Sequence, residues 1–322
     1  MEVELFEGIE PDPSVETVMK GADAMLKFQP DWIVAMGGGS PIDAAKAMWI
    51  KYEYPEITFE EMCKVFGIPA LRKKARFCAI SSTSGTATEV TAFSIITDYQ
   101  KGIKYPIADF EITPDVAIVD PDLAETMPKK LVAHTGMDAM THAVEAYVST
   151  GSNDFADAMC EKAVSLVFRF LPLAVADGND LLAREKMHNA SCMAGLAFNS
   201  AGLGVNHGMA HAIGGKLHIA HGRINAILLP KVLAYNADLS TVHKGEYCVA
   251  ARKYQRMAKV LDLPAPNVRL GVTNLIHEVE KLNRKIGIPA TLKAQGADLA
   301  KVKELKEELV AAALADATTA TN

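Results

Sequence analysis

The sequence lacks the features that mark several classes of protein. It contains no run of eighteen apolar residues, which excludes a transmembrane helix of ordinary length. Acidic and basic residues are mixed, the formal net charge is −6, and no basic block suggests a nucleic-acid partner. The first ten residues, MEVELFEGIE, lack the layout of a signal peptide, and the five cysteines form no CxxC pair. We therefore predict a cytoplasmic protein with reduced thiols and no nucleic-acid or membrane partner.

The sequence has enough apolar residues for one large domain or two ordinary ones, since 49% of its 322 residues are hydrophobic. Short strand patterns at residues 31–36, 76–82 and 115–120 alternate with helical patterns, which predicts a mainly parallel sheet with helices around it. From residue 129 onward the pattern is helical, and the final ATTATN is predicted to be a frayed end. We expect an α/β domain over 1–121 and an all-helical domain over 122–322.

A predicted strand, three glycines and a predicted helix start follow one another in VAMGGGSPIDAAK, residues 34–46. Ser40 is expected to cap the helix, with Pro41 at the first helical position and Asp43 in a capping-box position. Glycines allow close backbone approach, and free amides at a helix N-terminus attract phosphate, so we predict a pyrophosphate site. A tight turn without a ligand is the alternative, because the pattern is neither GxGxxG nor a Walker loop.

A second polar loop, ISSTSGTATEVT at residues 80–91, follows another predicted strand. Its hydroxyl groups are suited to hydrogen bonds with the ribose, phosphate or carboxamide of a cofactor. A Ser/Thr turn with no ligand is the alternative interpretation.

Four of the nine histidines lie in the segment NHGMAHAIGGKLHIAHG, residues 206–222. They are His207, His211, His218 and His221, and small or apolar residues lie between them. Chance or a solvated helix face is one explanation. Buried imidazoles need partners, however, and a divalent metal ion satisfies several of them at once, so we predict a metal site.

The segment GMDAMTHAVEAY supplies a second pair of metal-ligand types, Asp138 and His142, four residues apart. On a helix both side chains lie on the same face. One carboxylate and three imidazoles suit Fe²⁺ or Zn²⁺ acting as a Lewis acid. The spacing does not tell which two of the four clustered histidines bind, and a simple helix-surface pair is the alternative for Asp138 and His142.

The chain resembles the iron-containing (group III) alcohol dehydrogenase family, and most of all the alcohol dehydrogenase part of bacterial bifunctional aldehyde-alcohol dehydrogenases. The segments that carry the resemblance are EPDPSVETVMKGADAM, DWIVAMGGGSPIDAAKAMWI, ISSTSGTATEVTAFSIITD, KYPIADFEITPDVAIVDPDL, GMDAMTHAVEAYVS, GLGVNHGMAHAIGG and HIAHGRINAILLP. They span nearly the whole chain. The resemblance implies a dehydroquinate synthase-like fold, with an α/β dinucleotide-binding domain before an all-α metal-binding domain and the active site between them.

The resemblance also implies roles for particular residues. The metal ligands would be Asp138, His142, His207 and His221. The cofactor, NAD or alternatively NADP, would be held by Gly37, Gly38, Gly39, Ser40, Asp43, Thr83, Ser84, Thr86 and Lys104. His211 would lie near nicotinamide and substrate, where we expect it to relay a proton as the catalytic residue. Packing of His211 against the cofactor is the alternative, and His218 would have no role.

The expected reaction is reversible hydride transfer between nicotinamide and a short-chain aldehyde or primary alcohol. A related diol or hydroxy-acid dehydrogenase is one alternative, and a truncated, poorly active metal-binding or assembly module is another. The family usually begins with a further strand-helix-strand segment, so we expect a sheet that is incomplete at its N-terminus. The family usually has a small residue where this chain has His134. We expect a small-molecule substrate, and a homo-oligomer is one of the assemblies that the sequence allows.

Overall fold

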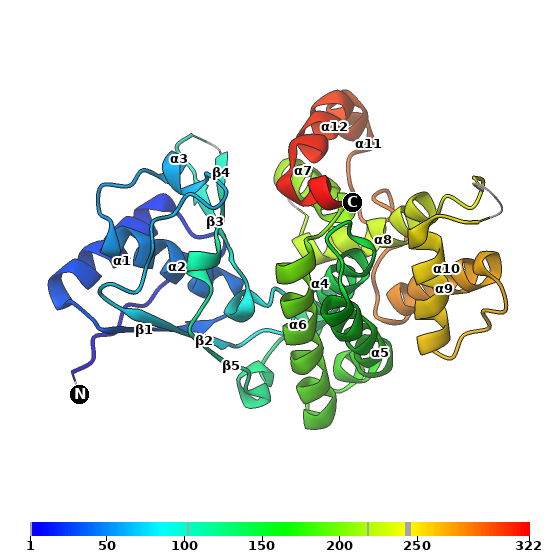
Figure 1. The fold of residues 1–322 in the computed structure, drawn as a ribbon, viewed down its shortest axis with the longest axis horizontal. Coiled ribbons are helices and arrows are strands. Elements are labelled where there is room, and N and C mark those ends of the chain that lie inside the picture. The colour runs from blue at the N-terminus through cyan, green and yellow to red at the C-terminus, as the bar shows by residue number, and fades with distance from the viewer. Residues whose placement is uncertain (1, 102, 218, 242–245) are drawn as a thin grey trace. The chain divides into compact units, whose positions relative to one another are not determined.

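The computed structural model describes residues 2–101, 103–217, 219–241 and 246–322 (Figure 1). The chain divides into two compact units, Met1–Ala124 and Glu125–Asn322. The boundary expected after residue 121 lies just before this division. None of the helices in the described ranges is long and apolar enough to cross a membrane.

The first unit contains a three-stranded parallel sheet with the strand order β1-β2-β5, as the strand-helix pattern predicts. Trp32 pairs with Arg76, and Cys78 pairs with Val116. The strands are β1 Trp32–Gly37, β2 Arg76–Ser81 and β5 Val116–Ile118; the helices are α1 Val15–Phe28, α2 Gly39–Glu53 and the short α3 Phe59–Met62. Three 3₁₀ turns complete the unit: η1 Thr88–Val90, η2 Phe110–Ile112 and η3 Pro121–Ala124.

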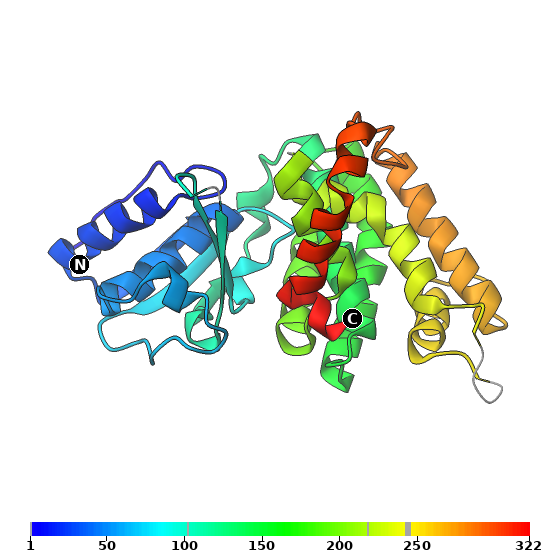
Figure 2. The same cartoon turned by 90° about the horizontal axis from the view of Figure 1, so that it is seen from above.

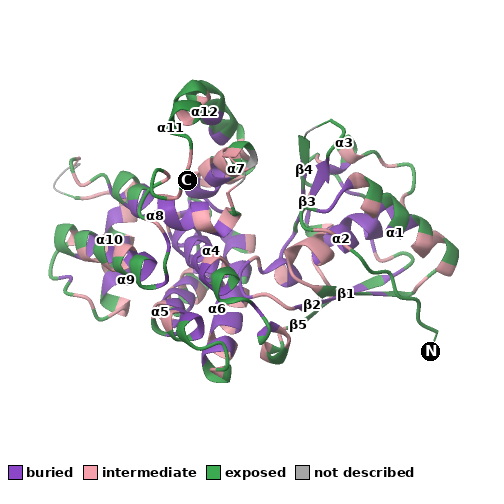
Figure 3. Ribbon diagram, turned by 180° about the vertical axis from the view of Figure 1, so that it is seen from behind, coloured by how far each residue is buried: buried purple, intermediate pink, exposed green. Residues whose placement is uncertain are grey.

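Two strands of this unit were not expected from the sequence. β3 Phe93–Asp98 and β4 Ile103–Ala108 form an antiparallel pair that is separate from the parallel sheet. Helix α2 packs on both β1 and β3, and most of its residues are buried (Figure 3). Within this core the rings of Trp49 and Phe77 are stacked at 5.3 Å, so α2 is fixed firmly against β2.

The second unit consists of helices joined by loops. Its elements are α4 Lys129–Val148, α5 Asp154–Ala176, α6 Leu181–Ala201, α7 Val205–Leu217, α8 His221–Ala237, α9 Val249–Val260, α10 Val268–Lys285, α11 Leu299–Glu304, α12 Lys306–Ala315 and the 3₁₀ turn η4 Ala317–Thr321. Helix α4 is central and packs against α5, α6 and α8 (Figures 1 and 3). A Cβ atom added at Gly222 would lie 2.3 Å from the carbonyl oxygen of His134, so α8 contacts the backbone of α4 directly.

The end of the chain is not frayed, and this expectation was wrong. Thr321 Oγ1 donates to the carbonyl of Leu203 at 2.8 Å, and Thr321 accepts from the amide of Thr150 at 2.9 Å. Asn322 Oδ1 accepts from the amide of Val205 at 3.1 Å. Both Figures 1 and 2 show α12 alongside α7. The last two residues therefore form hydrogen bonds with backbone groups at the start of α7 and after α4, which lie far from them in the sequence.

Candidate metal centre

Three helices bring the predicted metal ligands together. Asp138, His142 and Glu145 lie on one face of α4, because positions i, i+4 and i+7 share a helix face. His207 lies in the first turn of α7, and His221 is the first residue of α8. The close contact of α8 with α4 at Gly222 keeps His221 near Asp138.

The side chains of Asp138, His142 and His207 are buried, and each offers one ligand atom within 4.8 Å of the other two. The fourth expected ligand adjoins them, since His221 Nε2 lies 3.4 Å from Asp138 Oδ1. The rings of His142 and His207 are stacked at 4.6 Å. One carboxylate oxygen and imidazole nitrogens at these separations fit a first-row divalent ion, so the residues fit the metal that the sequence predicts.

Glu145 orients His207, a role that the sequence did not reveal. The Nδ1 atom of His207 forms a short hydrogen bond with Glu145 Oε2, while Glu145 Oε1 accepts from the amide of Asn206 at 2.6 Å. With Nδ1–H donating to the carboxylate, Nε2 is the atom that faces Asp138, 3.8 Å away. A carboxylate behind a ligand histidine holds its ring and tautomer for metal binding.

Asn225 is a second residue missed from the sequence. Its Nδ2 lies 2.7 Å from Asp138 Oδ1, 3.2 Å from His207 Nε2 and 3.1 Å from His221 Nε2. The amide oxygen of Asn225 accepts from Asn206 Nδ2 at 2.8 Å, which sets the orientation of the amide group. An amide NH₂ has two hydrogens, so it serves at most two of these three atoms. The converging lone pairs are therefore suited to a cation.

Electrostatics hold Asp138 and His221 in the protonation states that bind a metal ion, but they favour a proton on His207. Burial would raise the pKa of Asp138, but the surrounding imidazoles outweigh it and hold the pKa well below its usual range. Desolvation lowers the pKa of His221 to about 3, so this ring is neutral at neutral pH. Burial opposes charge on His207, but the carboxylates of Glu145 and Asp138 raise its pKa to about 9. A proton and a metal ion thus compete for His207 Nε2.

His211 lies beside the ligand cluster. Its ring is stacked on His221 at 5.1 Å and lies 6.0 Å from that of His207. Its Nδ1 is 2.8 Å from Asp316 Oδ2, so the loop after α12 holds the ring. The side chain is 38% exposed, unlike that of His207, so it has access to solvent. Its role as a proton relay stays a prediction, and His218 lies outside the described residues.

The glycine turn and the hydroxyl loop face each other in the first unit. A Cβ atom added at Gly38 would lie 2.9 Å from Thr83 Cγ2, and one at Gly39 would lie 3.0 Å from Thr86 Cγ2. Gly37 has a φ of +151°, which suits glycine. The buried Oγ1 atoms of Thr83 and Thr86 have no hydrogen-bond partner among the described residues. Unsatisfied hydroxyls beside a helix N-terminus fit a phosphate group.

The expected cap of α2 was wrong. The helix begins two residues earlier than expected, at Gly39, with Gly38 as the N-cap, and no side chain of the described residues caps the first turn. Ser40 is therefore inside the helix, where its Oγ accepts from the amide of Asp12. The glycine backbone takes up the turn without help from a side chain, which leaves the first amides of α2 uncapped for a ligand.

The other predicted cofactor residues have internal partners. Asp43 Oδ1 accepts from Thr88 Oγ1 at 2.7 Å, and Oδ2 accepts from the amide of Ile95 at 3.1 Å. Asp43 thus ties α2 both to the hydroxyl loop and to β3. Lys104, which is exposed, pairs with Asp12 at 2.7 Å, and Ser84 is buried in the hydroxyl loop. Contact of Asp43, Ser84 and Lys104 with a cofactor stays a prediction.

Comparisons with known proteins identify the class to which this fold and metal centre belong. Residues 132–322 match the family model for the Fe-containing alcohol dehydrogenase family, C-terminal, and residues 1–121 match the model for iron-containing alcohol dehydrogenase. The chain belongs to the iron-containing alcohol dehydrogenase family. It is an oxidoreductase that acts on CH–OH groups, and the expected family, fold class and enzyme class are confirmed.

Individual relatives agree with this assignment. The chain is 52% identical to the NADPH-dependent butanol dehydrogenase of Clostridium saccharobutylicum, over 100% of this chain and 80% of that protein. It is 41% identical to the bifunctional aldehyde-alcohol dehydrogenase AdhE of Escherichia coli (strain K12), over 96% of this chain and 37% of the relative. A crystal structure of 1,3-propanediol oxidoreductase superposes with a TM-score of 0.90 at 34% identity, covering 100% of this chain and 80% of the other.

Proposed function

We propose that the chain catalyses reversible hydride transfer between NAD(P)H and a short-chain aldehyde, with the primary alcohol as the reduced product. The observation that carries this proposal is the convergence of Asp138, His142, His207 and His221 from three helices. Similarity to the butanol dehydrogenase and to the 1-propanol dehydrogenase PduQ of Salmonella typhimurium, which is 40% identical, supports an alcohol of a few carbons.

The four ligand residues would hold Fe²⁺, with Zn²⁺ as the alternative ion. When bound, the ion supplies Lewis-acid stabilisation of the negative charge that develops on the substrate oxygen. Glu145 holds His207 with Nε2 toward Asp138, and Asn225 orients Asp138 through its 2.7 Å hydrogen bond. These contacts fix the ligands before any ion binds, which lowers the cost of ordering them.

His211 would carry the proton in this proposal. In our assignment Asp316 accepts a hydrogen bond from His211 Nδ1, so Nε2 is the atom left to exchange a proton with the alcohol oxygen and with solvent. Its partial exposure supports this role, because a relay must reach water. Asp316 would act as a positioning residue that fixes the tautomer of His211.

The first amides of α2 and the hydroxyls of Thr83 and Thr86 would bind the cofactor pyrophosphate. The cofactor supplies or accepts the hydride. We propose NAD, with NADP as the alternative, which the NADPH-dependent relative favours. We also propose that the protein is cytoplasmic and forms a homo-oligomer. Light scattering after gel filtration tests the oligomeric state.

A diol dehydrogenase is a second candidate, favoured by the likeness to 1,3-propanediol oxidoreductase. The test is anaerobic loading with Fe²⁺, followed by NADH and NADPH oxidation with butyraldehyde, acetaldehyde and 3-hydroxypropionaldehyde. We expect the highest kcat/KM with one of the two simple aldehydes. A clear preference for the hydroxyaldehyde would support the second candidate, and no turnover with any of the three would contradict both.

A further inference from the structure

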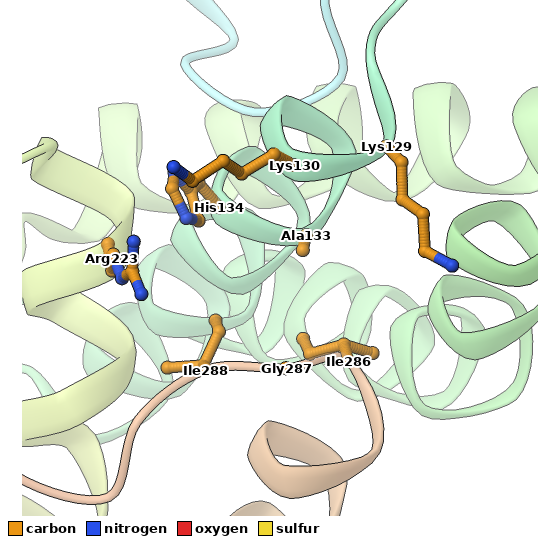
Figure 4. Close-up of a pocket in the computed structure, with 8 residues that line it drawn as sticks. All are labelled: Lys129, Lys130, Ala133, His134, Arg223, Ile286, Gly287 and Ile288. Atoms are coloured by element: carbon orange, nitrogen blue, oxygen red, sulfur yellow. The ribbon is translucent and has the colours of Figure 1, made fainter. Parts of the chain in front are cut away.

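A basic pocket of about 300 Å³ lies within the second unit, apart from the predicted ligand atoms (Figure 4). Its basic lining residues are Lys129, Lys130 and His134, from the first two turns of α4, and Arg223, from the first turn of α8. None of the described residues that line it is acidic. In Figure 4 Lys130 reaches toward His134 on the side nearest Arg223, and Lys129 lies at the other end.

The positive charge of this pocket is not balanced by the protein. Among the described residues, no carboxylate forms an ion pair with Lys129, Lys130 or Arg223. Arg223 Nε is buried and has no hydrogen-bond partner within those ranges. A buried guanidinium nitrogen without an acceptor is unfavourable. The pocket is therefore arranged for an anion that the protein itself does not provide.

The start of α4 adds to this positive field. Its N-cap is Pro128, no side chain in the described part of the chain caps the helix, and the first turn contains no acidic residue. Two lysines instead occupy the positions where a helix dipole favours negative charge. Burial together with the charges of Arg223 and Lys130 lowers the pKa of His134 to about 4, so its ring is neutral and able to donate a hydrogen bond.

The remaining wall of the pocket is apolar. Ile286 and Ile288, both buried, flank Gly287 in the loop after α10, and Ala133 lies across from them in Figure 4. Gly287 has a φ of +78°, and no atom of the residues that the structure describes lies within 4 Å of the position that a Cβ would take there. The loop thus leaves open space beside an apolar surface, which suits the carbon skeleton of an organic ligand.

We propose that this pocket binds a small phosphate monoester, a ligand class separate from the alcohol and the nicotinamide cofactor. The dianionic phosphate would lie between Lys130, His134 and Arg223, which offer charge-assisted hydrogen bonds from several directions. The carbon skeleton would lie against Ile286 and Ile288. The inference does not depend on the metal or on the proposed substrate, so its failure would leave the proposed function untouched.

Calorimetric titration of the metal-loaded protein with phenyl phosphate, at constant ionic strength, tests this proposal. We expect saturable binding of one molecule per chain, tighter than that of inorganic phosphate because the ring covers the isoleucines. Arg223→Gln should weaken binding about tenfold, and Lys130→Gln severalfold. Arg252→Gln is the matched control, because Arg252 pairs with Glu246 outside the pocket and should leave binding unchanged.

The glycine turn of the first unit also suits phosphate, so the titration is repeated in Gly38→Val. If the Gly38→Val protein loses phosphate binding while the Arg223→Gln protein keeps it, the proposal is overturned. The absence of saturable binding to the parent protein would overturn it as well. Melting temperature and metal content check each variant. If Arg223→Gln does not fold, the exposed Lys130→Gln decides alone: unchanged affinity overturns the proposal. Equal affinity for phenyl and inorganic phosphate would refute the organic ligand.

Discussion

Replacing Glu145 by glutamine tests how the protein prepares its metal centre. Both carboxylate oxygens of Glu145 accept buried hydrogen bonds, one from His207 Nδ1 and one from the amide of Asn206. The amide of Gln has the same shape but only one oxygen, so one of the two buried donors loses its acceptor. Leaving such a donor unsatisfied costs about 1–3 kcal/mol. If His207 is the donor affected, its ring is no longer fixed, and affinity for the metal should fall about 10–100-fold.

The assay is competition for Zn²⁺ or Co²⁺ between the apoprotein and a chromophoric chelator, for the parent and for Glu145→Gln. Glu161→Gln is the control, since Glu161 bonds to Tyr147 and Arg256 and is no part of the ligand cluster. We expect the control to bind metal as the parent does. Parent-like affinity in a folded Glu145→Gln protein would refute the claim that this carboxylate holds His207 for the metal.

Three further variants test other parts of the structure. Gly222→Ala would place a Cβ 2.3 Å from the carbonyl oxygen of His134, which should lower the free energy of unfolding by about 1–3 kcal/mol. We therefore expect a lower melting temperature and a lower metal occupancy than in the parent. Parent-like values would show that α8 is able to move away from α4. Gly38→Val should abolish NADH binding in a fluorescence titration while metal content is kept, because its side chain would fill the space against Thr83; unchanged affinity would reject the glycine turn as the phosphate site. His211→Gln should lower turnover about 10²–10⁴-fold and flatten its pH profile without loss of metal; parent turnover at saturating substrate and cofactor would exclude the relay.

The sequence predicts those parts of the fold that depend on interactions between residues close together in the chain. The strand that ends at Gly37 and the helix that follows the glycine turn are both present, because a short buried strand and a glycine turn have clear signatures. The β3–β4 pair was missed, although Asp98 Oδ1 accepts from the amide of Lys101 at 2.8 Å in the connection between the two strands, a contact typical of a turn. The start of α2 was misplaced because Ser40 and Pro41 resemble a cap.

The sequence predicted only part of the metal centre, as it did for the fold. The spacing of Asp138 and His142 predicts a shared helix face, but spacing alone could not select His207 and His221 from four histidines. That selection came from the family resemblance. Glu145 and Asn225 were missed, because a glutamate or asparagine in a helix has no signature until tertiary contacts bring it beside a ligand.

The most direct test of the central claim is metal analysis, together with aldehyde reduction, of anaerobically purified Asp138→Ala and His221→Ala proteins. Each change removes one of four proposed ligands, so we predict that bound iron and activity are lost together. His277→Ala, which alters an exposed histidine of α10, should keep both. Full iron occupancy in a folded Asp138→Ala or His221→Ala protein would contradict the proposed metal centre.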